Sequence, residues 1–395
     1  MVTRPTGRFE ALDSLRGICA LLVALFHLKS AGLVAGLPFI RNSWLFVDFF
    51  FVLSGFVIAA SYGDRLRSGF PVGRFMALRL GRVYPLHVFV LAVFALFELF
   101  KFALGATALT QKLPWQSPNS PLELFESLGL LQIFGFQDFL VWNGPSWSIA
   151  AEVWTYLIMA LVLAFTGTKS RVIVPLIAIA SLFVLALLGE PYLDRTFSFA
   201  LLRCLYGFAL GMMTFAAHRR IASRPQGASG SLVELVTVAA VVSFVSLVPS
   251  ENPVNLAAPF VFVGAVLVFA GEAGIISRVL TRPFPLLLGA LSYSIYMVHV
   301  FVEARAIDVL LVLSGKTGMP LASVTTSTEG ETAKILGSSD APWLGDAMSV
   351  AVLAAIVVTS WFTYRFVETP CREYVRRRVA QGTRPPLPAE TPAAF

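Results

Sequence analysis

Charged residues are scarce in this chain. They make up 13% of its 395 residues, whereas 57% are hydrophobic, and the mean hydropathy is +0.77. A soluble globular protein carries about one quarter charged residues. The shortage excludes an ordinary soluble domain and indicates a polytopic membrane protein. The net charge of +7 comes from arginines in short segments between apolar runs, so we also exclude a nucleic-acid-binding protein.

Cysteine is rare as well. Cys19, Cys204 and Cys371 have neither disulfide nor metal-site spacing. We therefore expect small packing side chains at these positions, and no metal. The chain also lacks a visible internal repeat, which is the usual mark of an inverted-repeat transporter. No clean cleavage site follows the basic residues at the N-terminus, so we expect the first apolar run to be retained.

Long apolar runs dominate what is present. A helix needs about 20 mostly apolar residues to cross a membrane, and the sequence predicts an all-α integral membrane protein with about ten transmembrane helices. The acidic apolar segment at 122–140 is expected to lie at the membrane interface. The ten runs are Ser14–Leu33, Trp44–Tyr62, Val83–Leu104, Ser146–Phe165, Val172–Leu188, Phe197–Ala217, Leu232–Val248, Ala257–Ala273, Pro285–Leu313 and Trp343–Tyr364.

The basic residues favour one orientation of these helices. With the N-terminus inside, the inner segments hold about three times as many Lys and Arg residues as the outer segments. Both termini are then cytoplasmic, which requires an even number of spans. We expect a polar, flexible outer loop at 315–342. We also expect a membrane domain at 9–370, followed by a disordered cytoplasmic tail at 371–395 that is first basic and then rich in Pro and Ala.

Ionisable side chains inside spans are costly and indicate function by default. Arg16 and His27 are eleven residues apart, so they lie about 16 Å apart along a helix and within about 20° of one another around it. The side chains that fall at a depth similar to His27, where they can neutralise one another in a shared polar cavity, are Asp48, Glu152, Arg203 and His299.

A second group of charges lies on the cytoplasmic side. Arg79 and Arg82 are three residues apart and share a helical face. Together with Arg16 they form a candidate clamp for a phosphate-rich ligand. The alternative for these arginines is topology signalling and contact with lipid headgroups. For His27 and His299 the alternative is a structural role in packing, and for Asp48 it is capping of a helix.

Five short sequence stretches follow one another along the chain, from Phe9 to His299. They are FEALDSLRGICALLVALFH at Phe9–His27, FVDFFFVLSGFVI at Phe46–Ile58, RLGRVYPL at Arg79–Leu86, NGPSWSIAAEVW at Asn143–Trp154 and LGALSYSIYMVH at Leu288–His299. Each alone is weak, but all five in order are specific. Together they resemble the membrane-bound acyltransferase family 3, bacterial O-acyltransferases of cell-surface sugars and of some small secondary metabolites.

The resemblance implies roles for individual residues. Arg16 and His27 match an arginine and a histidine of the first span that are tied to activity in the family. Arg79 and Arg82 match an R-x-x-R element that is linked to the acyl-CoA donor. The W-S-x-x-x-E stretch maps to Trp147, Ser148 and Glu152. Members commonly have a second Glu where this chain has Val153. Some members carry a fused esterase-like domain, and we expect this chain to be the stand-alone form.

These observations lead to a functional hypothesis. The enzyme transfers an acyl group, acetyl by default, from cytoplasmic acyl-CoA to a hydroxyl of a cell-surface carbohydrate or related glycosylated acceptor. It would lie in the bacterial cytoplasmic membrane, with polysaccharide-assembly proteins as partners. The three arginines hold the phosphates, and His27 is the base or nucleophile. Asp48 or Glu152 orients its imidazole. The residues expected to bind the acceptor are Trp147, Ser148, Arg203 and His299.

Two other classes of protein remain open at this stage. The first is a proton-coupled transporter of a sugar or a lipid-linked precursor, because His, Asp and Glu at mid-depth fit a proton relay. The second is a non-catalytic assembly subunit whose polar cluster serves only helix association.

Overall fold

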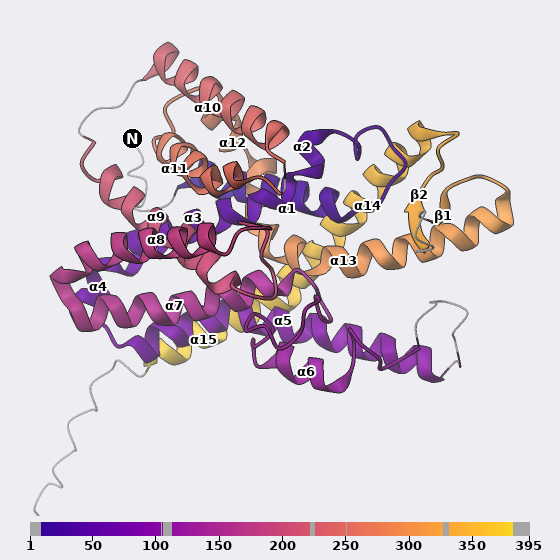
Figure 1. The fold of residues 1–395 in the computed structure, drawn as a ribbon, viewed down its shortest axis with the longest axis horizontal. Coiled ribbons are helices and arrows are strands. Elements are labelled where there is room, and N and C mark those ends of the chain that lie inside the picture. Colours follow the sequence, from indigo (N-terminus) through magenta and orange to yellow (C-terminus); the bar gives the residue numbers. More distant parts are fainter. Residues whose placement is uncertain are drawn as a thin grey trace, which may run out of the picture.

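A computed structural model describes residues 9–103, 105, 113–221, 226–249, 251–326 and 332–381. Most of these residues are helical (Figure 1). The helices and strands are α1 (Glu10–His27), α2 (Pro38–Arg41), α3 (Phe46–Ile58), α4 (Asp64–Arg67), α5 (Val72–Ala103), α6 (Pro121–Leu128), α7 (Ser146–Thr166), α8 (Ser170–Leu187), α9 (Ala200–His218), α10 (Gly227–Leu247), α11 (Ala258–Phe269), α12 (Ile275–Leu280), α13 (Pro283–Thr317), β1 (Ala322–Thr326), β2 (Thr332–Leu336), α14 (Pro342–Thr363) and α15 (Thr369–Gln381).

Each of the ten apolar runs coincides with a helix. In the part of the chain that the structure describes, six helical stretches are long and apolar enough to cross a membrane, which makes this a multi-pass helical membrane protein. The count of ten spans and the cytoplasmic termini remain predictions. The six stretches are Ser43–Arg67, Val72–Ala103, Ser146–Leu187, Ala200–His218, Gly227–Leu247 and Pro342–Gln381.

The described chain is mostly helical, as expected, but the loop expected at 315–342 contains two short strands. Strands β1 and β2 form an antiparallel hairpin in which Ala322 pairs with Leu336. The valine, isoleucine and threonines of these strands favour extended backbone. The N–H of Leu336 donates to the carbonyl of Lys29, and its carbonyl accepts from the N–H of Ala31. The hairpin is thereby fixed to the segment that follows α1.

The C-terminal segment continues beyond the last apolar run as a helix. A π-helical turn at Tyr364–Glu368 connects α14 to α15. Helix α15 packs against α5, where a side chain at Gly81 would collide with Val375. Residues 371–381 of the expected tail are therefore helical. The Pro- and Ala-rich residues 382–395 lie outside the described part of the chain.

Two pairs of helices cross at glycines. Gly17 of α1 lies against the backbone of Leu288 and Gly289 in α13, and Gly289 lies against the backbone of Asp13. Gly55 of α3 contacts the backbone of α9 in the same way. Small residues let transmembrane helices approach closely. Because α1 carries Arg16 and His27, its crossing with α13 determines which α13 side chains those two residues meet.

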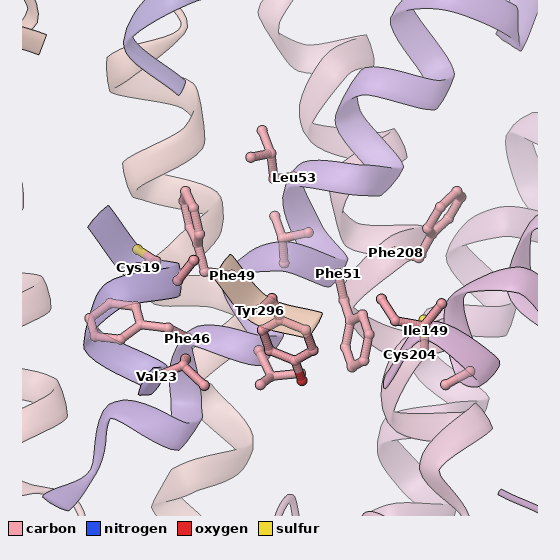
Figure 2. Close-up of a cluster of buried hydrophobic side chains, with 14 of the residues drawn as sticks. Cys19, Val23, Phe46, Phe49, Phe51, Leu53, Ile149, Cys204, Phe208 and Tyr296 are labelled. Atoms are coloured by element: carbon pink, nitrogen blue, oxygen red, sulfur yellow. The ribbon is translucent and has the colours of Figure 1, made fainter. Parts of the chain in front are cut away.

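The main core is a large apolar cluster built from several helices (Figure 2), and a smaller cluster contains Leu91, Val141 and Trp142. The main core contains two of the cysteines, Cys19 and Cys204, which are free and buried as expected for packing residues. Figure 2 shows how α1, α3, α7, α9 and α13 contribute to it. The labelled side chains are Cys19, Val23, Phe46, Phe49, Phe51, Leu53, Ile149, Cys204, Phe208 and Tyr296.

Candidate active site

A cavity of about 90 Å³ lies among α1, α3, α5, α7 and α13. Its lining follows α3 from Val47 to Ile58, which corresponds to about 16 Å of helix. The polar and aromatic part of the lining consists of Arg16, Phe50, Phe51, Ser54, Arg79, Arg82, Ser148, Glu152, Tyr156, Ser292, Tyr293 and Tyr296. All three arginines of the predicted clamp therefore face one cavity.

Arg16 is held in place by its neighbours. Its Nε donates to Ser292 Oγ at 2.9 Å, and its Nη2 lies 3.3 Å from the carbonyl of Gly289 and 3.4 Å from Asp13 Oδ1. Two of these three partners belong to α13. The glycine crossing of α1 and α13 thus brings the guanidinium to the side of the cavity.

Arg79 and Arg82 have no such acidic partners. In the described part of the chain, no carboxylate lies within 4.0 Å of either guanidinium. Arg79 stacks over the ring of Tyr62 at 4.7 Å, and its buried Nε has no hydrogen-bond partner. Tyr62 belongs to the π-helical turn that follows α3. The end of the cavity nearest this turn therefore presents two arginines that form no ion pair with a described carboxylate.

Glu152 is the carboxylate in the cavity wall. It accepts hydrogen bonds from Tyr156 Oη at 2.6 Å and from Ser54 Oγ. Tyr156 belongs to α7, as does Glu152, whereas Ser54 belongs to α3, so the bond from Ser54 joins the two helices. His27 is not among the partners of Glu152, and the expectation that Glu152 orients this imidazole is not met by the geometry.

Tyr296 lies at the opposite end of the cavity from Tyr62. Its hydroxyl is hydrogen-bonded to Ser148 Oγ at 2.8 Å, and its ring meets that of Phe50 edge-on at 5.9 Å. The ring of His299 lies 5.7 Å from it, one turn further along α13. Tyr296 therefore separates the cavity from the histidines, and neither His27 nor His299 lines the cavity wall.

His27 and His299 form a pair. His299 Nε2 lies 3.4 Å from His27 Nδ1, and the two ring centroids are 5.0 Å apart. His299 is fully buried, whereas His27 is half-buried. Two helices that are far apart in sequence, α1 and α13, supply the two rings.

Asp48 and Arg203 form a separate ion pair, so Asp48 does not orient His27. The two carboxylate oxygens accept from Arg203 Nε at 3.0 Å and Nη2 at 2.7 Å. Both side chains are buried, and the guanidinium lies 5.2 Å from the ring centres of Trp44 and Trp147. Of the four expected acceptor residues, only Ser148 lines the cavity, while Trp147, Arg203 and His299 lie outside it.

The geometry on its own fits any enzyme that binds an anionic substrate beside a histidine. Comparison with known families narrows this choice. A family model described as an acyltransferase domain matches residues 9–365, which is nearly the whole chain. The chain belongs to the acyltransferase 3 family.

Membership in the acyltransferase 3 family favours an acyltransferase over the transporter and the assembly subunit. The chain is also similar to "Protein 2 in picA locus" from Rhizobium radiobacter, with 39% identity over 106 residues. That similarity covers 27% of this chain and about half, 53%, of the relative. No solved structure matches the chain.

The acyltransferase cavity contains residues that were not singled out in the sequence. Ser54 and Tyr156 bind Glu152, Ser292 binds Arg16, and Tyr296 closes one end. Ser54, Ser292 and Tyr296 stand inside stretches that resemble the family, so their position was a usable clue. Tyr156 lies just beyond such a stretch, one helical turn after Glu152, which places both on the same face of α7.

Proposed function

We propose that the protein transfers an acyl group, acetyl in the simplest case, from cytoplasmic acyl-CoA to a hydroxyl of a cell-surface carbohydrate or related glycosylated acceptor. The enzyme would act in the bacterial cytoplasmic membrane. The observation that carries the proposal is the cavity in which Arg79 and Arg82 face inward without a described acidic partner. It lies beside a histidine pair in an acyltransferase 3 chain.

The arginines suit the nucleotide part of the donor. Coenzyme A carries a diphosphate and a ribose phosphate, and the planar guanidinium binds phosphate oxygens through two parallel N–H groups. An arginine already paired with a carboxylate would have to break that pair first. Arg79 and Arg82 need not do so. Ser292 and Gly289 hold the guanidinium of Arg16 in one orientation, in which it can bind a phosphate.

The acyl end of the donor would point away from these arginines, along the cavity. The apolar lining of α3, including Phe50 and Phe51, suits a short acyl chain and its thioester arm. In this proposal the thioester passes Tyr296 to reach His27. This passage would require the Ser148–Tyr296 hydrogen bond to open and the buried ring of Tyr296 to move.

The reaction at His27 needs only the acyl-CoA thioester and the acceptor hydroxyl. Nε2 removes the proton from the acceptor hydroxyl as its oxygen attacks the thioester carbonyl carbon, and a C–O bond forms. The tetrahedral intermediate then collapses and the C–S bond breaks. The sulfur leaves as a thiolate and takes the proton from His27 Nε2. The products are an O-acyl ester and the free thiol of coenzyme A, and the histidine returns to its neutral form.

The test is acyl transfer by the purified protein in lipid nanodiscs. Acetyl-CoA is supplied with a cell-surface carbohydrate fraction, and both thiol release and ester formation are measured. We expect thiol release that depends on the carbohydrate, with a matching mass increase of the acceptor, and the loss of both in His27→Ala. Full transfer by a folded His27→Ala protein would reject His27 as the base. The absence of any thiol release from acyl-CoA would reject the donor.

A further inference from the structure

His299 lies beside the proposed base and does not line the cavity, so the expected role in acceptor binding does not account for it. It is 0% exposed, so it meets no substrate in this structure. Its Nδ1 lies 2.7 Å from the carbonyl oxygen of Tyr296, and its Nε2 faces His27 Nδ1 at 3.4 Å. On the other side, His27 Nδ1 lies 2.9 Å from the carbonyl oxygen of Val23. These three contacts determine where the protons of both rings are.

A carbonyl oxygen only accepts hydrogen bonds. The nitrogen facing it must therefore carry the proton, which gives Nδ1–H in both His27 and His299. A neutral imidazole has one N–H and one bare nitrogen. His299 Nε2 is then bare and accepts from His27 Nδ1–H, which it shares with the carbonyl of Val23. His27 Nε2 is bare as well, and it makes no hydrogen bond to a described residue.

We propose that His299 is a positioning residue that orients His27 for base catalysis. By accepting from Nδ1–H, its Nε2 holds the imidazole in the tautomer whose Nε2 can take a proton. The same contact stabilises the imidazolium that forms when His27 becomes protonated, since Nδ1–H is then a stronger donor. The inference rests on the proposed function, because it assigns His299 a task only if His27 is the base.

Two acceptors face His27 Nδ1–H, the carbonyl oxygen of Val23 at 2.9 Å and His299 Nε2 at 3.4 Å, and His299 is the one that a substitution can remove. In an acid–base triad a carboxylate orients the histidine. In the described part of the chain, no carboxylate is hydrogen-bonded to either ring. Asp48 is occupied by Arg203, and Glu152 is occupied by Ser54 and Tyr156. A neutral nitrogen acceptor at 3.4 Å takes the place of the carboxylate.

Two substitutions distinguish a role of His299 as a hydrogen-bond acceptor from a role in packing alone. His299→Gln keeps an acceptor, its amide oxygen, close to the position of Nε2. His299→Met fills a similar volume without an effective acceptor. We expect kcat of the transfer reaction to fall at least about tenfold in His299→Met, with the KM for acetyl-CoA changed by less than about twofold. In His299→Gln, kcat should stay within about threefold of the wild type.

His87 offers the matched control. It is also fully buried, and its Nε2 contacts a main-chain carbonyl, that of Ser127. It lies in α5 and does not line the cavity. His87→Met should disturb the packing of a buried histidine to a similar extent but leave kcat close to that of the wild type.

The tautomer can also be observed directly in the wild-type protein. The chain has four histidines, so the ¹⁵N spectrum of histidine-labelled protein is assigned by single substitutions. We expect His27 to carry its proton on Nδ1 and to show an unprotonated Nε2. This measurement does not depend on the folding of a variant.

Three results would overturn the inference. They are a wild-type kcat in His299→Met, a His299→Gln protein that is as slow as His299→Met, and a His27 that is protonated on Nε2. A failure of the proposed function would be seen in a different variant, because His27→Ala would then retain transfer activity. If His27→Ala is inactive and His299→Met is fully active, His27 remains the proposed base but His299 is not a positioning residue.

Discussion

At the scale of single residues, the basic side chains fall into two groups with opposite roles. Arg203 is buried and is neutralised by Asp48 within 3.0 Å. Arg79 and Arg82 line a cavity and have no described acidic partner. Buried opposite charges that satisfy one another stabilise an arrangement of helices. Charges that face a cavity without a partner are available to a ligand.

The first prediction concerns the buried pair. Asp48→Ala removes the carboxylate that pairs with the buried guanidinium of Arg203, which then keeps only Asp194 Oδ1 at 3.9 Å. Breaking a buried ion pair in this way costs up to about 3–5 kcal/mol. We expect a lower yield of folded protein and a lower midpoint of thermal unfolding in detergent. The double variant Asp48→Leu/Arg203→Met removes both charges and should recover much of the loss. If the folded double variant has no transfer activity, Asp48 or Arg203 acts in the reaction itself.

The sequence predicts part of this residue-scale arrangement. Depth and helical face place Arg16, Arg79 and Arg82 on the same side, and the structure brings them to one cavity. The same reasoning joined five groups into one polar cluster, whereas the structure separates the Asp48–Arg203 pair from the histidine pair. The position of a residue along its helix gives the depth of its side chain in the membrane. The neighbours of that side chain depend on how each helix is rotated and which helix lies next to it.

At the scale of helices, that rotation is set by close contacts at glycines. Gly17 and Gly289 bring α1 and α13 together, so that Arg16 reaches Ser292 and His27 reaches His299. Apolar runs reveal the existence of both helices but not this contact. The glycines are visible in the sequence, yet nothing in the sequence alone says which other helix each of them meets.

The second prediction tests this crossing. In Gly289→Val, the added side chain meets the backbone of Asp13 and pushes α1 away from α13. We expect a destabilisation of about 1–3 kcal/mol or more, together with a loss of transfer activity, because the two histidines move apart. Gly264→Val is the matched control, since Gly264 lies within α11 and has no heavy atom within 4 Å of an added Cβ. Equal thermal midpoints for the two variants would argue against the tight crossing.

The third prediction concerns the closed end of the cavity. Tyr296 in α13 and Ser148 in α7 meet between the cavity and the histidines. In Tyr296→Ala the end opens and the apolar channel becomes longer. We expect the ratio of kcat/KM for butyryl-CoA to that for acetyl-CoA to rise by about tenfold. An unchanged ratio in a variant with the wild-type thermal midpoint would show that Tyr296 does not limit the length of the acyl chain.

At the scale of the whole molecule, the protein is a mostly helical chain in which apolar helices pack around an apolar core that contains a partly polar cavity. Composition and hydropathy were sufficient to predict this class. The β1–β2 hairpin was missed because its strands are only five residues long and alternate polar with apolar side chains. Such short segments do not stand out from a polar loop.

The fourth prediction is the orientation in the membrane. Lys169 and Lys316 are both exposed and lie on opposite sides if the inner segments are the more basic ones. Each is replaced by cysteine in a Cys371→Ser background, since the other two native cysteines are buried. A membrane-impermeant maleimide should label Lys316→Cys in intact cells and Lys169→Cys only after permeabilisation. Labelling in the reverse order would invert the proposed topology and place the arginines on the outer side.

The central claim is that the arginines and His27 serve opposite ends of one donor molecule. The most direct measurement compares coenzyme A-dependent thermal stabilisation with acetyl-CoA turnover in three variants. These are Arg79→Ala/Arg82→Ala, His27→Ala and the control Arg278→Ala, whose arginine does not line the cavity.

We predict that coenzyme A stabilises the wild type, His27→Ala and Arg278→Ala but not the double arginine variant, while His27→Ala alone binds the donor without turnover. A double arginine variant that is stabilised as strongly as the wild type would contradict the account.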